Sequence, residues 1–197
     1  MATTAEAAPG APYPLRFDID YPESLSRWLI FVKWLLAFPH FLIIYALLAV
    51  ASVIQFIAFF AILFTKRYPR GLFDFVVNIY RWNANVSAYV GFLRDDYPPF
   101  SWDPGKYPVT FEVDYPEQLS RWLIFFKWLL AFPHYIVLGL VYIVAMLLWF
   151  LAFFAILFTG RFPRGMFDFI VGTLRWSYRV QAYTYLLTDQ YPPFSTK

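Results

Sequence analysis

Two long stretches of the chain carry no charged residue. They run from Phe41 to Phe64 and from Tyr135 to Phe158. A helix of about 20 apolar residues crosses the hydrocarbon core of a bilayer, so each stretch is long enough to span it. A soluble domain would need far more polar chain to enclose two such helices. The pattern therefore predicts a membrane protein.

Shorter patterns precede each apolar stretch. Leu15–Tyr21 and Val109–Tyr115 alternate apolar and polar residues, which is typical of short strands. Arg27–Phe38 mixes tryptophan with basic residues and indicates a helix at the membrane interface, with Lys33 reaching toward the headgroups. Pro39 lacks a backbone donor and is expected to break this helix and turn the chain into the membrane.

A polar stripe follows one side of each helix expected after the apolar stretches, over Leu72–Leu93 and Met166–Leu187. Charged residues at mid-membrane cost about 2.5–3.5 kcal/mol each, so these helices must turn the stripe toward protein or lie in the interface. We expect structural ion pairs between helices or between repeats; an ion or proton path is the alternative. The stripe consists of Asp74, Asn78, Arg81 and Asn85, and then of Asp168, Gly172, Arg175 and Arg179.

Nearly all of these features occur twice, at a constant offset of 94 residues. KWLLAFPH occupies Lys33–His40 and again Lys127–His134, AFFAILFT occupies 58–65 and 152–159, and YPPFS occupies 97–101 and 191–195. Such similarity indicates a tandem duplication. The predicted organisation is a flexible tail (1–14), a first membrane repeat (15–101), a linker (102–108) and a second membrane repeat (109–197).

The same motifs resemble those of an uncharacterised bacterial membrane protein family, a domain of unknown function. Its members carry KWLLA-PH, FFAILFTG-PRG-FDF, RW and YPPF in that order, and both repeats of this chain show the series. The resemblance implies a bacterial membrane protein, and it implies no activity and no catalytic residue.

Charges in the loops bear on topology. An excess of lysine and arginine marks cytoplasmic loops, and two short loops here are basic. We predict an all-α membrane protein in the bacterial cytoplasmic membrane, in which each repeat has an interfacial helix and two transmembrane helices, four spans in total, with short extended segments outside. The basic loops are then cytoplasmic and suited to anionic headgroups. Their basic residues are Lys66, Arg67, Arg70, Arg161 and Arg164.

Composition narrows the possible chemistry. The chain is 60% hydrophobic and 24% aromatic, has no cysteine and carries a net charge of +3. Disulfides and thiolate metal sites are excluded, and nothing suggests nucleic acid. No phosphate loop, metal-ligand spacing or nucleophile elbow is present, so we expect no enzyme activity and no cofactor. His40 and His134 are expected at the water boundary; as a symmetric pair they are alternatively axial ligands of haem or a pigment.

These patterns favour a non-enzymatic polytopic membrane protein. We expect an accessory or scaffold subunit that binds membrane lipids and either forms a homo-oligomer or joins a membrane protein complex. The alternative is a small channel or transporter built on the repeat, because duplicated transporter folds place their sites at the repeat interface.

Overall fold

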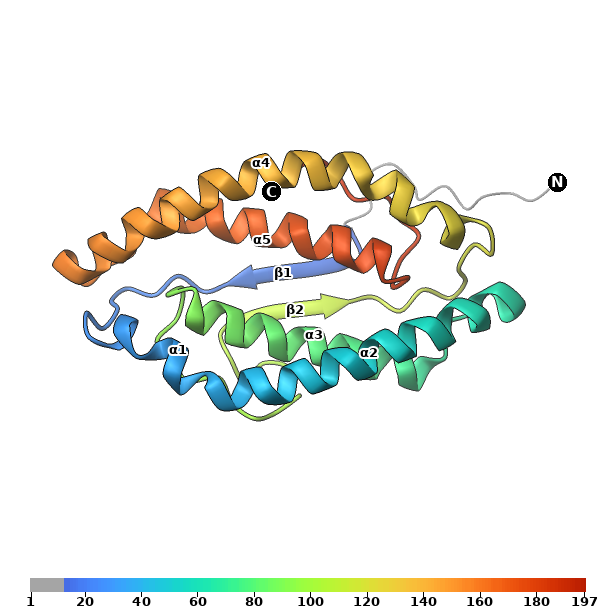
Figure 1. The fold of residues 1–197 in the computed structure, drawn as a ribbon, viewed down its shortest axis with the longest axis horizontal. Coiled ribbons are helices and arrows are strands. Elements are labelled where there is room, and N and C mark those ends of the chain that lie inside the picture. The colour runs from blue at the N-terminus through green and yellow to red at the C-terminus, as the bar shows by residue number, and fades with distance from the viewer. Residues whose placement is uncertain (1–12) are drawn as a thin grey trace.

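The computed structural model describes residues 13–197, which form two pairs of helices and a small two-stranded sheet (Figure 1). The chain is mostly helical, and the two predicted strands are present. In chain order the elements are β1 (Leu15–Ile19), η1 (Leu29–Phe31), α1 (Lys33–Leu36), α2 (Phe38–Thr65), α3 (Arg70–Val90), β2 (Val109–Val113), α4 (Leu123–Thr159) and α5 (Arg164–Thr184). The predicted tail lies outside the described residues, except for Tyr13 and Pro14.

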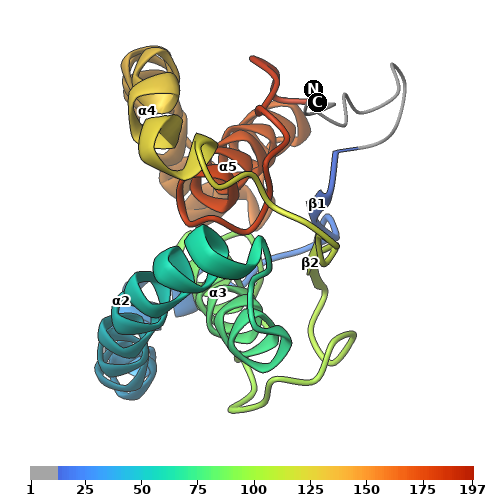
Figure 2. The ribbon, with the colours of Figure 1, turned by 90° about the vertical axis from the view of Figure 1, so that its right-hand side faces the viewer.

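The elements form three layers, which Figure 2 shows end-on. The first layer is α2 with α4, the second is α3 with α5, and the third is β1 with β2. Within each repeat the long apolar helix packs on the helix that follows it, α2 on α3 and α4 on α5. The strand layer therefore lies on the opposite side of the molecule from α2 and α4, the two most apolar helices.

Only a narrow stripe of α2 is buried against α3. Spacings of three, four and seven residues keep such a stripe on one side of a helix, and its alanines let the two helices approach closely. α4 buries the equivalent positions against α5, except that Leu148, the counterpart of Ile54, is only partly buried. The buried residues of α2 after His40 are Ile44, Ala51, Ile54, Ala58 and Ile62.

The two strands pair across the repeats in an antiparallel ladder centred on Phe17 opposite Phe111. These two phenylalanines are equivalent in the duplication, so a pseudo-twofold axis passes between them. Each strand also lies against the buried helix of the other repeat, β1 on α5 and β2 on α3. Tyr178 of α5 contacts both central rings, at centroid distances of 4.8 and 5.3 Å. The repeats exchange their strands and share one core.

The expected break at the KWLLAFPH proline occurs in one repeat only. In the first, Ala37 separates α1 from α2, and Pro39 lies in the first turn of α2, where a missing donor costs little. In the second, α4 continues through Pro133 as one helix of 37 residues. The prediction of a separate interfacial helix is therefore wrong for the second repeat, whose proline is accommodated within a gently curved helix (Figure 1).

The helices expected as the second span of each repeat are buried inside the protein. In α3 the exposed residues are Arg70, Gly71 and Asp74, all in its first turns, and α5 repeats this pattern. Among the described residues, only α2 and α4 are long and apolar enough to cross a membrane. Moreover, β1 and β2 lie beside the middle of the helices rather than beyond their ends (Figure 1). The strands therefore do not extend the molecule beyond the ends of its long helices, and the placement of the extended segments outside the membrane stays a prediction.

Candidate functional site

The lysine of the first KWLLAFPH motif is buried in an ion pair. Its Nζ lies 2.8 Å from Oδ1 of Asp95 and donates to the carbonyl of Arg94 at 2.6 Å. The same nitrogen lies 5.0 Å from the centroid of the Tyr89 ring, close enough for a cation–π contact. Burial lowers the pKa of Lys33, and the neighbouring carboxylate of Asp95 acts in the opposite direction.

The second motif reproduces this geometry. Lys127 Nζ lies 2.8 Å from Oδ1 of Asp189, donates to the carbonyl of Thr188 at 2.6 Å, and lies 5.0 Å from the centroid of the Tyr183 ring. The expectation that Lys33 reaches the headgroups is therefore wrong, because its ammonium group binds inside the protein to a carboxylate and a carbonyl in the segment that follows α3. The neighbouring Trp34 is exposed, as an interfacial residue would be.

The histidine of each motif is enclosed by aromatic rings from its own repeat. Trp82 Nε1 donates to Nδ1 of His40 at 3.1 Å, and the ring of Phe100 stacks on the imidazole with centroids 4.0 Å apart. In the second repeat Trp176 donates to His134 at 3.1 Å, and Phe194 stacks at 3.8 Å.

This enclosure explains why the KWLLAFPH, RW and YPPF motifs occur together. The aromatic residues of RW and YPPF cover the histidine, and Tyr97 also donates to the carbonyl of Leu36 at 3.1 Å. His40 and His134 are fully buried, so their expected place at the water boundary is wrong. Since Nδ1 accepts a hydrogen bond, a neutral ring carries its proton on Nε2. Haem or pigment ligation by the pair stays a prediction.

The arginines of the polar stripe face the exchanged strands. Arg81 Nε donates to the carbonyl of Phe111 at 3.0 Å, and Arg175 Nε donates to the carbonyl of Phe17 at 2.7 Å. Arg175 also forms an ion pair with Asp18 at 2.9 Å. Both arginines have partners from the other repeat, but only Arg175 forms an ion pair there. The partners are strand groups, however, and not the acids of the stripe.

The remaining stripe residues have separate roles. Asp74 pairs with Arg70 one turn earlier, at 3.0 Å, and both side chains are at least half exposed; Asp168 pairs with Arg164 in the same way. Asn78 accepts a hydrogen bond from Arg81. Arg179 donates to the carbonyl of Lys197 at 2.6 Å. The stripe residues therefore do not form one cluster. Some contact the strands, some contact the C-terminal segment, and some are exposed to solvent.

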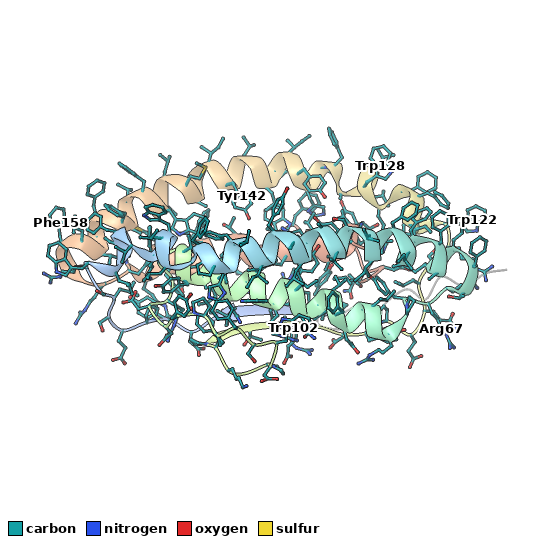
Figure 3. All side chains as sticks on the ribbon, turned by 60° about the horizontal axis from the view of Figure 1, so that its bottom comes forward. Arg67, Trp102, Trp122, Trp128, Tyr142 and Phe158 are labelled. Carbon is teal, nitrogen blue, oxygen red and sulfur yellow. The ribbon has the colours of Figure 1, made fainter. Side chains whose placement is uncertain are left out.

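The two basic loops lie at opposite ends of the long molecule, because α2 and α4 run antiparallel (Figure 1). Arg67 is labelled at one end in Figure 3. Lys66, Arg67 and Arg161 are exposed, and Arg70 and Arg164 place their guanidinium groups over the rings of Tyr115 and Tyr21, at 4.5 and 4.6 Å. Each loop thus contacts the segment that follows the strand of the other repeat.

A groove of about 360 Å³ lies between α2 and α4, lined by apolar residues that include Phe56, Phe59 and Trp128. Gln55 borders it and donates to the carbonyl of Thr184. The equivalent residue in the second repeat is Trp149, whose larger side chain donates to the carbonyl of Gly91 at 2.8 Å. The duplication is therefore not symmetric at this surface.

Comparison with known families agrees with the motifs. The chain matches the family described as "Domain of unknown function (DUF4389)" over residues 27–101 and again over 121–196, and it belongs to this family. Each match begins after the strand of its repeat, so the family unit consists of the helices with their YPPF segment, whereas the duplication in this chain also includes the strands. No curated protein and no solved structure matches the chain.

Proposed function

We propose that this chain is a non-enzymatic integral membrane protein, an accessory or scaffold subunit that binds lipid and packs against other membrane proteins or further copies of itself. Its place is the bacterial cytoplasmic membrane. The observation that carries the proposal is the exposure of α2 and α4. In their most apolar windows only 22% and 17% of the residues are buried.

This exposure separates the two helices from the core helices of a soluble protein, which are mostly buried. Patches of large apolar side chains beyond a few hundred Å² mark protein or membrane contacts. The exposed side chains include Tyr45 at 79%, Phe56 at 66% and Met146 at 66%. From residue 128 to residue 158 the surface of α4 carries no charge.

The contacts of the buried polar groups support a structural role for them. The buried lysines pair with Asp95 and Asp189, and the histidines accept from tryptophans of their own repeats. The arginines of α3 and α5 bind strand carbonyls. Each of these groups joins one element to another, which is what a rigid scaffold requires.

Photo-crosslinking in the native membrane tests the proposal. A photoreactive residue replacing Leu147, exposed on α4, should yield adducts with another membrane protein or a second copy. The matched control replaces Glu112, exposed on β2, and should yield none of these adducts. The proposal is wrong if Leu147 gives lipid adducts alone, the purified chain is a monomer, and no membrane protein co-purifies with it.

A further inference from the structure

The exposed apolar and charged side chains lie on opposite sides of the molecule. Figure 3 shows mostly carbon atoms in the side chains along the edge formed by α4, and many nitrogen and oxygen atoms along the edge that holds the strands. α3 and α5 lie between the two (Figure 2), and their exposed residues are confined to their first turns. The polarity of the protein changes across its layers and not along its helices.

One cluster of charged side chains on the strand layer lies at the middle of the long axis. Arg16 pairs with Glu112 at 3.1 Å and with Asp114 at 2.9 Å, and about half of each side chain is exposed. These residues flank the Phe17–Phe111 pair at the pseudo-twofold axis. If α2 and α4 crossed a bilayer upright, this cluster would lie at mid-membrane, where each charge costs about 2.5–3.5 kcal/mol.

The apolar surface of α4 is also longer than a bilayer is thick. Its 37 residues extend over about 55 Å at 1.5 Å per residue. Trp122 at one end and Phe158 at the other are 75% and 71% exposed (Figure 3). The hydrocarbon core measures about 30 Å, and about 40–45 Å with the headgroups. An upright α4 would leave apolar side chains in water, whereas a helix in the membrane plane has no such limit.

Basic side chains gather at both ends of this surface. Arg121 donates to the carbonyl of Phe64 beside Lys66 and Arg67, and the other end holds Arg27 next to Gly160. Both groups suit the anionic headgroups that surround an embedded apolar face. The four exposed tryptophans lie in the same end regions, as expected of residues at the headgroup level. They are Trp28, Trp34, Trp122 and Trp128.

We propose that the protein lies flat in a single leaflet of a phospholipid bilayer, an inference that rests on the membrane function proposed above. α2 and α4 lie in the hydrocarbon, parallel to the membrane plane. The buried helices α3 and α5 lie above them, and the strand layer faces water. Both basic ends are then on one side of the membrane, the cytoplasmic side, although they are at opposite ends of the molecule.

The absence of native cysteine makes single-cysteine labelling a direct test. Arg67→Cys and Arg161→Cys mark the two ends, Thr110→Cys marks the exposed middle of the strand layer, and Leu147→Cys is the control on the apolar surface. All four side chains are exposed, so the substitutions leave the core intact. Each variant is treated with a membrane-impermeant maleimide in sealed right-side-out and in inside-out membrane vesicles.

Flat insertion predicts equal labelling of positions 67, 110 and 161 from the cytoplasmic face and background labelling from the other. Leu147→Cys should remain at background from both faces until the protein is denatured. Labelling of 67 and 161 from opposite faces overturns the proposal in favour of upright α2 and α4, and labelling of 110 from the face opposite to 67 and 161 overturns it in favour of four spans. If alkaline carbonate releases the protein and Leu147→Cys reacts in water, the membrane function itself is wrong.

Discussion

The ammonium nitrogen of Lys33 lies 2.8 Å from a carboxylate oxygen of Asp95, but the two side chains are desolvated unequally. The lysine side chain is 1% exposed and that of the aspartate is 27% exposed. An unpaired charge costs most where water cannot reach it. The lysine therefore depends on the pair more than the aspartate does.

This inequality predicts an order of stability among variants. Asp95→Asn should lower the free energy of unfolding by about 3 kcal/mol, because it leaves a buried ammonium without its counter-charge. Lys33→Met should cost less, since water still reaches the aspartate, and the double variant should be more stable than Asp95→Asn alone. Thermal unfolding of the three variants in one detergent measures the order.

The second repeat supplies a control for this order. Asp189→Asn and Lys127→Met remove the equivalent pair and should fall in the same sequence. Equal losses for Lys33→Met and Asp95→Asn would contradict the account, because they would mean that the aspartate depends on the pair as much as the lysine does.

Removing the first buried histidine should destabilise the protein. His40→Ala leaves the Trp82 N–H without its acceptor and creates a cavity against Phe100. We expect a loss of about 2–4 kcal/mol in unfolding free energy, from the cavity and the unsatisfied donor together. Phe41→Ala, at an exposed neighbouring position, is the matched control and should change the unfolding temperature little.

The absorption spectrum of the same variants tests the ligand hypothesis for this residue. Protein purified from its native membrane should show no absorption band at wavelengths longer than that of the aromatic side chains, with or without His40→Ala. A visible band in the wild type that disappears in the variant would show that the imidazole binds a pigment. The contacts with Trp82 and Phe100 would then not account for the whole role of His40.

The stripe residues Asp74 and Arg81 should act independently. Asp74→Asn removes an exposed pair and should cost about 0–1 kcal/mol, whereas Arg81→Met leaves the Phe111 carbonyl without its donor and should cost about 1–3 kcal/mol. The double variant should equal the sum within about 0.5 kcal/mol. Recovery of stability in the double variant would instead indicate that the two residues form an ion pair.

Gly172 occupies the stripe position that is Asn78 in the first repeat, and the end of the chain crosses it. A Cβ at Gly172 would lie 2.5 Å from the carbonyl oxygen of Thr196. Gly172→Ala should therefore cost about 1–3 kcal/mol and release the C-terminal segment to proteolysis. Gly139→Ala, with nothing within 4 Å of its Cβ, should be neutral or stabilise the helix by up to about 1 kcal/mol.

Local patterns in the sequence predict the elements well but not their partners. The alternation at Leu15–Tyr21 identifies the buried side of β1, and the same pattern at Val109–Tyr115 identifies β2. Alternation does not say which strand pairs with which. The exchange depends on Arg81 and Arg175 meeting the strands of the opposite repeat, a contact between residues far apart in the chain.

The site was missed for a similar reason. A lysine next to a tryptophan, as at Lys33 and Trp34, is typical of a membrane-interface anchor. This local pattern does not reveal that the lysine is buried. Asp95 appears in the sequence only as one of several acids after the second helix. Asp95 can pair with Lys33 because α3 runs back along α2 and brings the two residues close together. The signal that could have identified the pair is its repetition, since Lys127 and Asp189 preserve the same separation.

The depth of α2 in the bilayer tests the central claim most directly. A fluorophore attached to cysteine at Leu42, Val53 or Phe64, three exposed positions along α2, is quenched by lipids with nitroxides at known depths. The account predicts the same depth, within the hydrocarbon of one leaflet, at all three positions. Depths that change steadily along the helix, from one headgroup layer through the bilayer centre to the other, would contradict it and show that α2 crosses the membrane.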